Sequence, residues 1–90
     1  MGREHGPEAA EFSRQLGRNL VAFRREGGLS QEVTADRAGL HRTEVALIES
    51  GERLPRLDTI VKLAGAVEVE PCALLMGMAW KLDPPKGGSK

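Results

Sequence analysis

The sequence predicts an all-α fold of five helices. Apolar residues recur at steps of three and four along most of the chain, which is the spacing of one helix face. Glycines and good N-cap residues separate these periodic segments, and no segment alternates apolar and polar residues as a half-buried strand does. The chain has 90 residues, 40% of them hydrophobic. We therefore expect one small domain over 8–82, between a flexible leader in 1–7 and a disordered Pro/Gly-rich tail in 83–90.

The first predicted helix begins at Glu8, directly after Pro7. Proline suits a first helical turn, where the N–H that it lacks would have no partner. Gly27 and Gly28 end this helix, because glycine adopts the left-handed cap conformation at little cost. Its apolar stripe consists of Ala9, Phe12, Leu16, Leu20 and Phe23.

The next two predicted helices are short and closely spaced. Ser30 is a good N-cap for a helix over 31–38, which Gly39 ends. The two residues after Gly39 form a turn, and a third helix follows over 42–50 with Gly51 as its cap. Two short helices joined by a tight glycine turn have the shape of a helix-turn-helix, whose second helix fits the major groove of DNA.

Two further helices complete the expected fold. Residues 52–56 form a loop, and the spacing of apolar residues then predicts a fourth helix. Its core positions are Leu57, Ile60, Val61, Leu63, Ala64 and Val67. Pro71 opens a fifth helix, which carries Leu74, Leu75 and Met78.

The open side of the third predicted helix carries the candidates for reading DNA bases. Arg42 is suited to the bidentate contact with guanine O6 and N7. Thr43 is suited to a base or a phosphate, and Leu47 to a thymine methyl group. Glu44 either accepts a hydrogen bond from cytosine N4 or reaches back to cap its own helix. Ala46 completes this face, and the inward positions are Val45 and Ile48.

Charge alone does not indicate a strong DNA-binding protein. The 13 basic and 13 acidic residues balance to a net charge of zero, whereas nucleic-acid-binding domains are usually basic. Their distribution is uneven, because residues 14–56 hold eight arginines and six acids while residues 1–13 hold one arginine and three acids. A small basic face can lie on a neutral protein, so we expect modest affinity per subunit.

Several other classes of protein are not indicated. Cys72 is the only cysteine, so we expect no intramolecular disulfide and interpret this residue as a small buried hydrophobe. No run of about 18 apolar residues and no signal-peptide core are present, which favours the cytoplasm. We expect neither a metal nor another cofactor, since no cluster has metal-ligand spacing. No nucleophile has an orienting partner, so an enzyme is not expected.

Several segments together resemble one known family. From about Leu16 to Leu75, the chain resembles the lambda-repressor-like, Cro-type helix-turn-helix family, in which bacterial regulators are common. The matching segments occur in the family's order and spacing: Leu29-Ser30-Gln31-Glu32, Ala35-Asp36-Arg37-Ala38-Gly39-Leu40, Ile48-Glu49-Ser50-Gly51 and Pro55-Arg56-Leu57, with Leu63-Ala64 after them.

The resemblance implies roles for matching residues. Arg42 and Thr43 match the first base-reading positions and Leu47 a later one. Gln31 matches the phosphate-side glutamine that opens the second helix, where the helix dipole also favours a phosphate; its amide can bond that phosphate or a neighbouring side chain. Taken singly, the arginines are commonly solvated surface charges, but as a set beside this motif they favour a DNA role. The expected backbone contacts are Ser30, Gln31, His41, Arg53 and Arg56.

A pair of charges is implied to have a structural role. Arg24 and Glu49 match residues that tie the first helix to the end of the third, although an ordinary surface pair worth under about 1 kcal/mol is the alternative. The sequence also departs from the family. Thr34 replaces a buried leucine and must bond a helix carbonyl or cost about 1–3 kcal/mol. Glu68 replaces a glycine where a left-handed backbone is strained; His41 and Leu47 are further replacements.

We interpret the chain as a sequence-specific transcriptional regulator. It is expected to be a repressor that binds a palindromic operator in double-stranded DNA as a homodimer, with half-sites about 34 Å apart. A plasmid, phage or restriction-modification control protein fits this size, and Arg42-Thr43 resembles the last of these.

The apolar C-terminal end leaves an alternative open. Met76, Met78, Trp80 and Leu82 either close the core over the first helix, near Phe12, or form a dimer surface, since Trp and Met are enriched at interfaces. The alternative function is an antitoxin or adaptor module whose helical domain or C-terminal end binds a protein partner.

Overall fold

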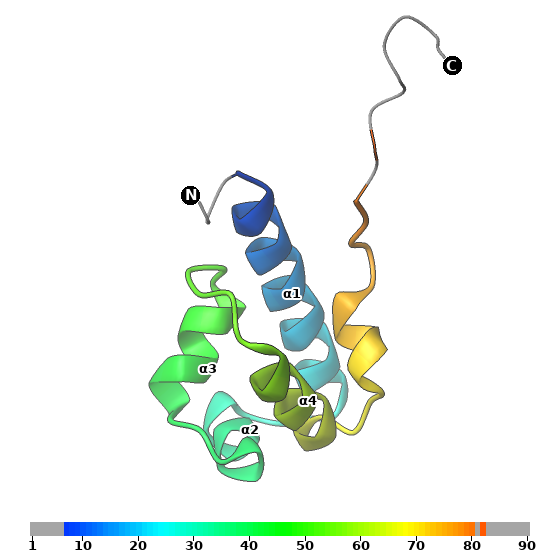
Figure 1. The fold of residues 1–90 in the computed structure, drawn as a ribbon. Coiled ribbons are helices and arrows are strands. Elements are labelled where there is room, and N and C mark those ends of the chain that lie inside the picture. Colours follow the sequence, from blue (N-terminus) through cyan, green and yellow to red (C-terminus); the bar gives the residue numbers. More distant parts are fainter. Residues whose placement is uncertain (1–6, 81, 83–90) are drawn as a thin grey trace, which may run out of the picture.

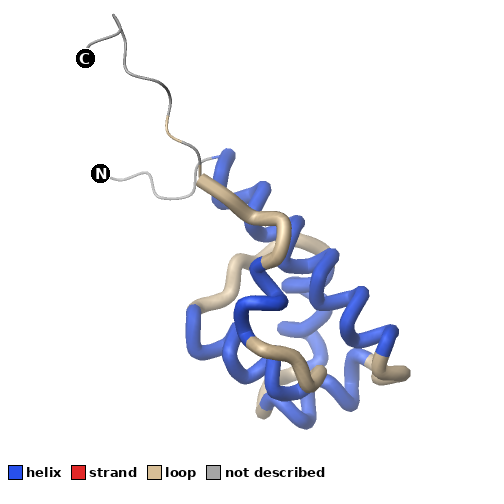
Figure 2. Tube along the Cα trace, turned by 90° about the vertical axis from the view of Figure 1, so that its right-hand side faces the viewer, coloured by secondary structure: helices blue, strands red, loops and turns tan. Residues whose placement is uncertain are grey.

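The computed structural model describes residues 7–80 and 82, and this part of the chain is entirely helical with connecting loops (Figure 1). The elements are α1 (Pro7–Glu26), α2 (Gln31–Ala38), α3 (Arg42–Glu49), α4 (Leu57–Ala66) and a 3₁₀ helix (Pro71–Leu75). Helices account for most of the trace, and short loops join them (Figure 2). The predicted all-α class is confirmed. The predicted leader and tail lie outside the described residues, apart from Pro7, which belongs to α1.

The prediction of a fifth α-helix is wrong, because Pro71–Leu75 forms a 3₁₀ helix. The Asn19 side-chain amide donates to the carbonyl oxygens of Leu74 and Met76, both at 2.8 Å. The Leu74 carbonyl would accept from the Met78 N–H in an α-helix, but that N–H bonds Leu75 O instead. Long-range contact with α1 therefore ends the helix after one turn and lays the following residues along α1.

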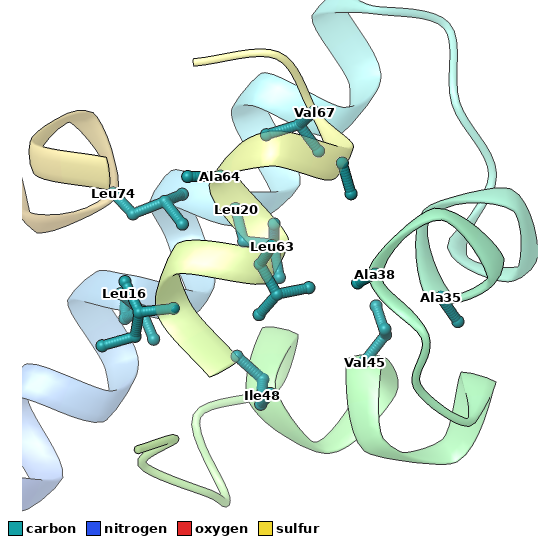
Figure 3. Packing of buried hydrophobic residues seen from close by; sticks show 12 residues of the cluster. Leu16, Leu20, Ala35, Ala38, Val45, Ile48, Leu63, Ala64, Val67 and Leu74 are labelled. Carbon is teal, nitrogen blue, oxygen red and sulfur yellow. The ribbon is translucent and has the colours of Figure 1, made fainter. Parts of the chain in front are cut away.

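The core lies where α1, α3 and α4 meet (Figure 3). Leu16 and Leu20 of α1 point toward Leu63 of α4, and Val45 and Ile48 of α3 close the other side. All five side chains are buried. This burial holds the inner face of α3 in the core and leaves its other face toward solvent.

The predicted turn chemistry between α2 and α3 is confirmed. The Ser30 hydroxyl accepts a hydrogen bond from the Val33 N–H at 3.0 Å. Gly39 has φ +72°, and its N–H bonds the carbonyls of Ala35 and Asp36. A side chain at this φ is strained, so a glycine here permits the sharp change of direction that sets α3 against α2.

A further glycine has a role that the sequence analysis missed. Gly17 lies in the middle of α1, where α1 crosses the C-terminal end of α3. A Cβ atom on Gly17 would lie 2.5 Å from the carbonyl oxygen of Glu49 and 2.6 Å from that of Ile48. Both distances are far inside van der Waals contact, so only glycine permits this approach of the two helices.

Two of the family departures have the predicted structural consequences. Thr34 is completely buried, and its hydroxyl oxygen has no hydrogen-bond partner, so the costlier of its two predicted outcomes is found. Glu68 has φ +63°, which is a left-handed conformation that disfavours side chains. Arg37 donates to the carbonyl of Ala66 at 3.0 Å and thereby helps fix the chain beside this residue. Cys72 was predicted to be buried and is exposed, because it lies on the outer side of the short 3₁₀ helix.

Candidate nucleic-acid interface

The outward face of α3 is formed by the residues that the sequence predicted as base readers. Arg42 and Thr43, at the N-terminal end of the helix, are exposed. Glu44, Ala46 and Leu47 are half-buried. The outermost side chains of α3 are therefore those of its first turn, which is the part that contacts base edges in helix-turn-helix proteins.

The N-terminus of α3 carries no side-chain cap from its N-cap residue. His41 has an extended backbone, and its side chain makes no capping hydrogen bond. Glu44 makes no capping bond among the hydrogen bonds of the described residues; its carboxylate lies 4.0 Å from Arg53 Nη1. Free N–H groups at a helix N-terminus attract phosphate, and His41 lies next to them.

The opposite end of α3 is fastened by a bidentate ion pair. Arg24 Nε lies 2.5 Å from Glu49 Oε2, and Arg24 Nη2 lies 3.0 Å from Glu49 Oε1. The remaining arginine nitrogen, Nη1, donates to the carbonyl of Leu29 at 2.8 Å. The two side chains are only 12% and 5% exposed, so the implied structural tie is found rather than a solvated surface pair.

The environment of this pair raises the pKa of Arg24. The charge-assisted hydrogen bond to Glu49 has the largest effect, desolvation acts in the opposite direction, and the charge of Glu49 raises the pKa further. The guanidinium stays charged at every physiological pH, so the tie does not depend on pH near neutrality through this residue.

Gln31 links the fastened end of α3 to its open end. Its Nε2 donates to Glu49 Oε1 at 2.9 Å, and its Oε1 lies 3.4 Å from Arg42 Nη1. From the sequence, the amide is predicted to contact a phosphate or a neighbouring side chain, and contacts with two neighbouring side chains are found. The position of Glu49 relative to Gln31 follows from tertiary structure, so no local signal predicted this contact.

The other predicted backbone residues lie in the loop that follows α3. Arg53 and Arg56 have exposed side chains, at 49% and 83%. Arg56 Nη2 lies 3.0 Å from the Asp58 carboxylate, and within the described residues no hydrogen bond or ion pair joins Arg56 to α3. These arginines are free to reach toward a phosphate, because pairs this exposed contribute at most about 1 kcal/mol.

The C-terminal apolar residues differ in how exposed they are. Met76, Trp80 and Leu82 are exposed, whereas Met78 is half-buried and packs against the core. Phe12, Leu75, Met78, Ala79 and Trp80 line an open groove of about 300 Å³. The 3₁₀ helix lies across α1 from α3 (Figure 1). Leu57 and Val61 of α4 are also exposed. The sequence predicts both as core positions, and this prediction is wrong.

The described residues contain no group of three or more His, Cys, Asp or Glu side chains placed to hold a metal ion. Within the same residues, no helix combines the length and the apolar character needed to cross a membrane.

The fold and the open face of α3 define a DNA-binding protein of the helix-turn-helix class. The family model described as helix-turn-helix matches residues 20–74, and the chain belongs to this family. Control protein C.SmaI of Serratia marcescens is 38% identical over 60 residues, which cover 67% of this chain and 71% of that protein. An uncharacterized HTH-type transcriptional regulator, y4dJ of Sinorhizobium fredii, is 32% identical over 65 residues, which cover 72% of this chain and 84% of that protein.

Solved structures agree with this assignment. The restriction-modification controller protein C.AhdI from Aeromonas hydrophila superposes with a TM-score of 0.67 and is 40% identical, over 69% of this chain and 94% of that one. A hypothetical transcription factor from Neisseria, NHTF, gives a TM-score of 0.71 at 33% identity, over 84% and 86% of the two chains. The protein is a DNA-binding transcriptional regulator.

Proposed function

We propose that this regulator is a repressor that binds a palindromic operator as a homodimer, with α3 in the major groove. The observation that carries the proposal is the exposure of Arg42 and Thr43 at one end of a helix whose other end is locked to α1. A reading side chain needs such a rigid support, because each base contact depends on its placement. Occupancy of the operator by the bound dimer would block transcription.

Each proposed contact has its own physical basis. Arg42 reads guanine and Thr43 bonds a base or phosphate, while Leu47 contacts a thymine methyl group. Glu44 accepts from cytosine when it releases Arg53, from which it is 4.0 Å away. Ala46 keeps the centre of the face shallow enough for close approach. The residues proposed to contact the DNA backbone are Ser30, Gln31, His41, Arg53 and Arg56.

The proposed dimer surface is the C-terminal apolar surface, formed by Met76, Met78, Trp80 and Leu82. Trp80 and Leu82 are 66% and 83% exposed. Tryptophan and methionine are enriched at interfaces, and exposed apolar patches mark interaction sites. Asn19 holds the backbone of Met76 against α1, so part of this surface is already ordered in the monomer. A second copy of the chain is the proposed occupant.

The biological setting that we propose is control of a restriction-modification system. C.SmaI is named a control protein, and C.AhdI is named a restriction-modification controller protein. These two proteins are 38% and 40% identical to this chain over 67% and 69% of its length. The proposal therefore rests on what these two relatives are named and on the fold that they share with this chain.

Selection from a random pool of double-stranded DNA tests the function directly. The full chain is incubated with the pool, and the retained duplexes are sequenced. We expect an inverted repeat with half-site centres about 34 Å apart and an affinity that falls steeply with salt as phosphate counterions are released. Retention without any enriched sequence, or binding that salt does not weaken, would overturn the proposal.

A second candidate function is favoured by the exposed C-terminal apolar residues and by the net charge of zero. In this alternative, the domain is an antitoxin or adaptor that binds another protein. The double variant Trp80→Ser/Leu82→Ser separates the two functions. A dimeric repressor is expected to become monomeric and to lose operator affinity, whereas an adaptor keeps its DNA affinity and loses only the protein partner.

A further inference from the structure

The Gln31 side chain lies between two groups of opposite charge. On one side its Nε2 donates to the Glu49 carboxylate at 2.9 Å, and on the other its Oε1 faces the Arg42 guanidinium at 3.4 Å. Gln31 opens α2, while Glu49 and Arg42 are the last and first residues of α3. One amide therefore connects both ends of the proposed recognition helix with the start of the preceding one.

The direction of this amide is fixed by chemistry. An ionised carboxylate only accepts hydrogen bonds, so the nitrogen of Gln31 must face Glu49 and its oxygen must face away. A guanidinium only donates, so the outward oxygen matches Arg42. The reversed amide would place an oxygen against the Glu49 carboxylate and a nitrogen against Arg42, and both contacts would be repulsive.

The carboxylate that orients the amide is itself immobile. Arg24 holds both of its oxygens, and Arg24 is fixed in turn by the carbonyl of Leu29. The Glu49 side chain is 5% exposed, so water does not compete effectively for these bonds. A chain of side-chain contacts thus runs from the buried Arg24–Glu49 pair through Gln31 to the exposed Arg42.

We propose that Glu49 and Gln31 are positioning residues for Arg42, and that the buried Arg24–Glu49 pair thereby contributes to base specificity as well as to folding. The inference rests on the proposed function, in which Arg42 reads a base. Gln31 Oε1 restrains one guanidinium nitrogen, so that the remaining N–H groups face the groove. The contact is long and exposed, and its effect is modest: about fivefold in base discrimination, the size expected for an exposed charged contact.

A phosphate contact is a simpler role for Gln31, and it predicts a different effect on base preference. If the amide only contacts a phosphate, its loss weakens binding to all sequences alike, because phosphate contacts carry no sequence information. If it positions Arg42, its loss weakens discrimination at the base pair that Arg42 reads. The base preference at that one position therefore separates the two roles.

The first test repeats the random-duplex selection with four variants. Arg42→Ala marks the base position concerned, and Gln31→Met removes both amide contacts while keeping the side-chain shape. Arg24→Met/Glu49→Met replaces the ion pair by an apolar pair, a change that commonly preserves stability. Arg25→Met, at an exposed neighbour of Arg24, is the matched control. Thermal unfolding checks that each variant is folded.

We expect Gln31→Met and the double variant to flatten the preference at the position marked by Arg42→Ala, each by about fivefold, and the control to keep the wild-type profile. A uniform loss of affinity with unchanged base preferences would overturn the inference. So would a double variant that is folded and retains the wild-type preference, because the ion pair would then be structural only.

A second measurement uses the protein without DNA and so separates failure of this inference from failure of the proposed function. We expect the side-chain ¹⁵N order parameter of Gln31 to lie near that of rigid backbone, about 0.85, and to fall below about 0.6 in Arg24→Met/Glu49→Met. A mobile Gln31 in the wild-type protein would overturn the positioning role even if the selection yields a palindrome. A rigid Gln31 with no enriched sequence would instead count against the proposed function.

Discussion

The two ends of α3 differ in how firmly they are held. At the C-terminal end, Glu49 is bonded by Arg24 and Gln31, and Gly17 lets α1 approach to backbone contact. At the N-terminal end, Arg42 and Thr43 are exposed, and the N-cap residue His41 makes no side-chain cap. The helix is anchored at one end while its other end projects into solvent, so the residues that hold α3 and the residues proposed to read bases lie at opposite ends of the same eight-residue element.

The contrast has a physical basis in burial. Charges removed from water are strongly coupled to their partners, while exposed charges are screened and exchange partners readily. An arginine that reads DNA needs N–H groups that are free for the bases, whereas an anchoring arginine uses its N–H groups within the protein. Arg42 and Arg24 meet these opposite demands within one connected network.

Breaking the ion pair at the anchored end of α3 should have the largest effect on the free energy of unfolding. Glu49→Met leaves Arg24 charged and nearly buried, and removal of one partner from a buried pair typically costs about 3–5 kcal/mol. Urea unfolding of the variant measures the loss. The exposed pair gives the comparison: Asp58→Asn, beside Arg56, should cost much less, because solvent screens an exposed pair. Equal costs for the two variants would contradict the distinction between anchor and surface pair.

The close approach of α1 to α3 gives the next largest effect. Gly17→Ala places a Cβ atom against two backbone carbonyls and should lower the free energy of unfolding by about 1–3 kcal/mol. Gly65→Ala is the matched control, because position 65 lies in α4 with open space around it. The control should raise stability by about 0.8–1.0 kcal/mol through helix propensity. If Gly17→Ala were also stabilising, the crossing of the two helices would not be this close.

The buried hydroxyl of Thr34 offers a gain in stability behind the reading face. Thr34→Val keeps the shape and removes the unpartnered oxygen, so thermal unfolding should show an increase of about 1 kcal/mol. Thr43→Val, at an exposed position of α3, should change stability by less than about 0.5 kcal/mol. A destabilised Thr34→Val variant would mean that the hydroxyl has a partner after all.

The smallest expected effect is the pH dependence from Asp58. Desolvation raises its pKa, but the hydrogen bond from the Thr59 N–H and the charges of Arg56 and Lys62 together outweigh it, so the pKa lies below the ordinary 3.8. A carboxyl whose pKa is lower in the folded state stabilises the fold above its unfolded pKa and loses this effect as the pH falls through its folded pKa. Asp58→Asn should therefore differ from wild type at neutral pH and match it in strong acid. An equal difference at both pH values would contradict the shift.

Features set by local chemistry could be predicted from the sequence. Ser30 caps α2 and Gly39 ends it in the predicted conformation, since both depend on the backbone within a few residues. Resemblance to a known family marked Thr34 as a residue that must bond a helix carbonyl or stay unsatisfied, and Glu68 as a residue in a strained left-handed position; the hydroxyl of Thr34 is unsatisfied and Glu68 is left-handed. The Arg24–Glu49 tie was implied only by resemblance to a known family, because no local pattern links two residues that are 25 positions apart.

Features set by tertiary contact could not be predicted in this way. The helix after Pro71 is 3₁₀ because Asn19, more than fifty positions earlier, binds its carbonyls. The close approach at Gly17 and the bond from Gln31 to Glu49 depend on how three helices meet. No pattern of spacing along the chain encodes these contacts.

The most direct test of the account compares wild type and Arg42→Ala on two duplexes, the operator obtained by selection and a random sequence of equal length. At the same salt concentration, we expect a loss of about 1–3 kcal/mol on the operator and a smaller loss on the random duplex. An equal loss on both would contradict the claim that the free end of α3 reads bases, because it would reduce Arg42 to a phosphate contact.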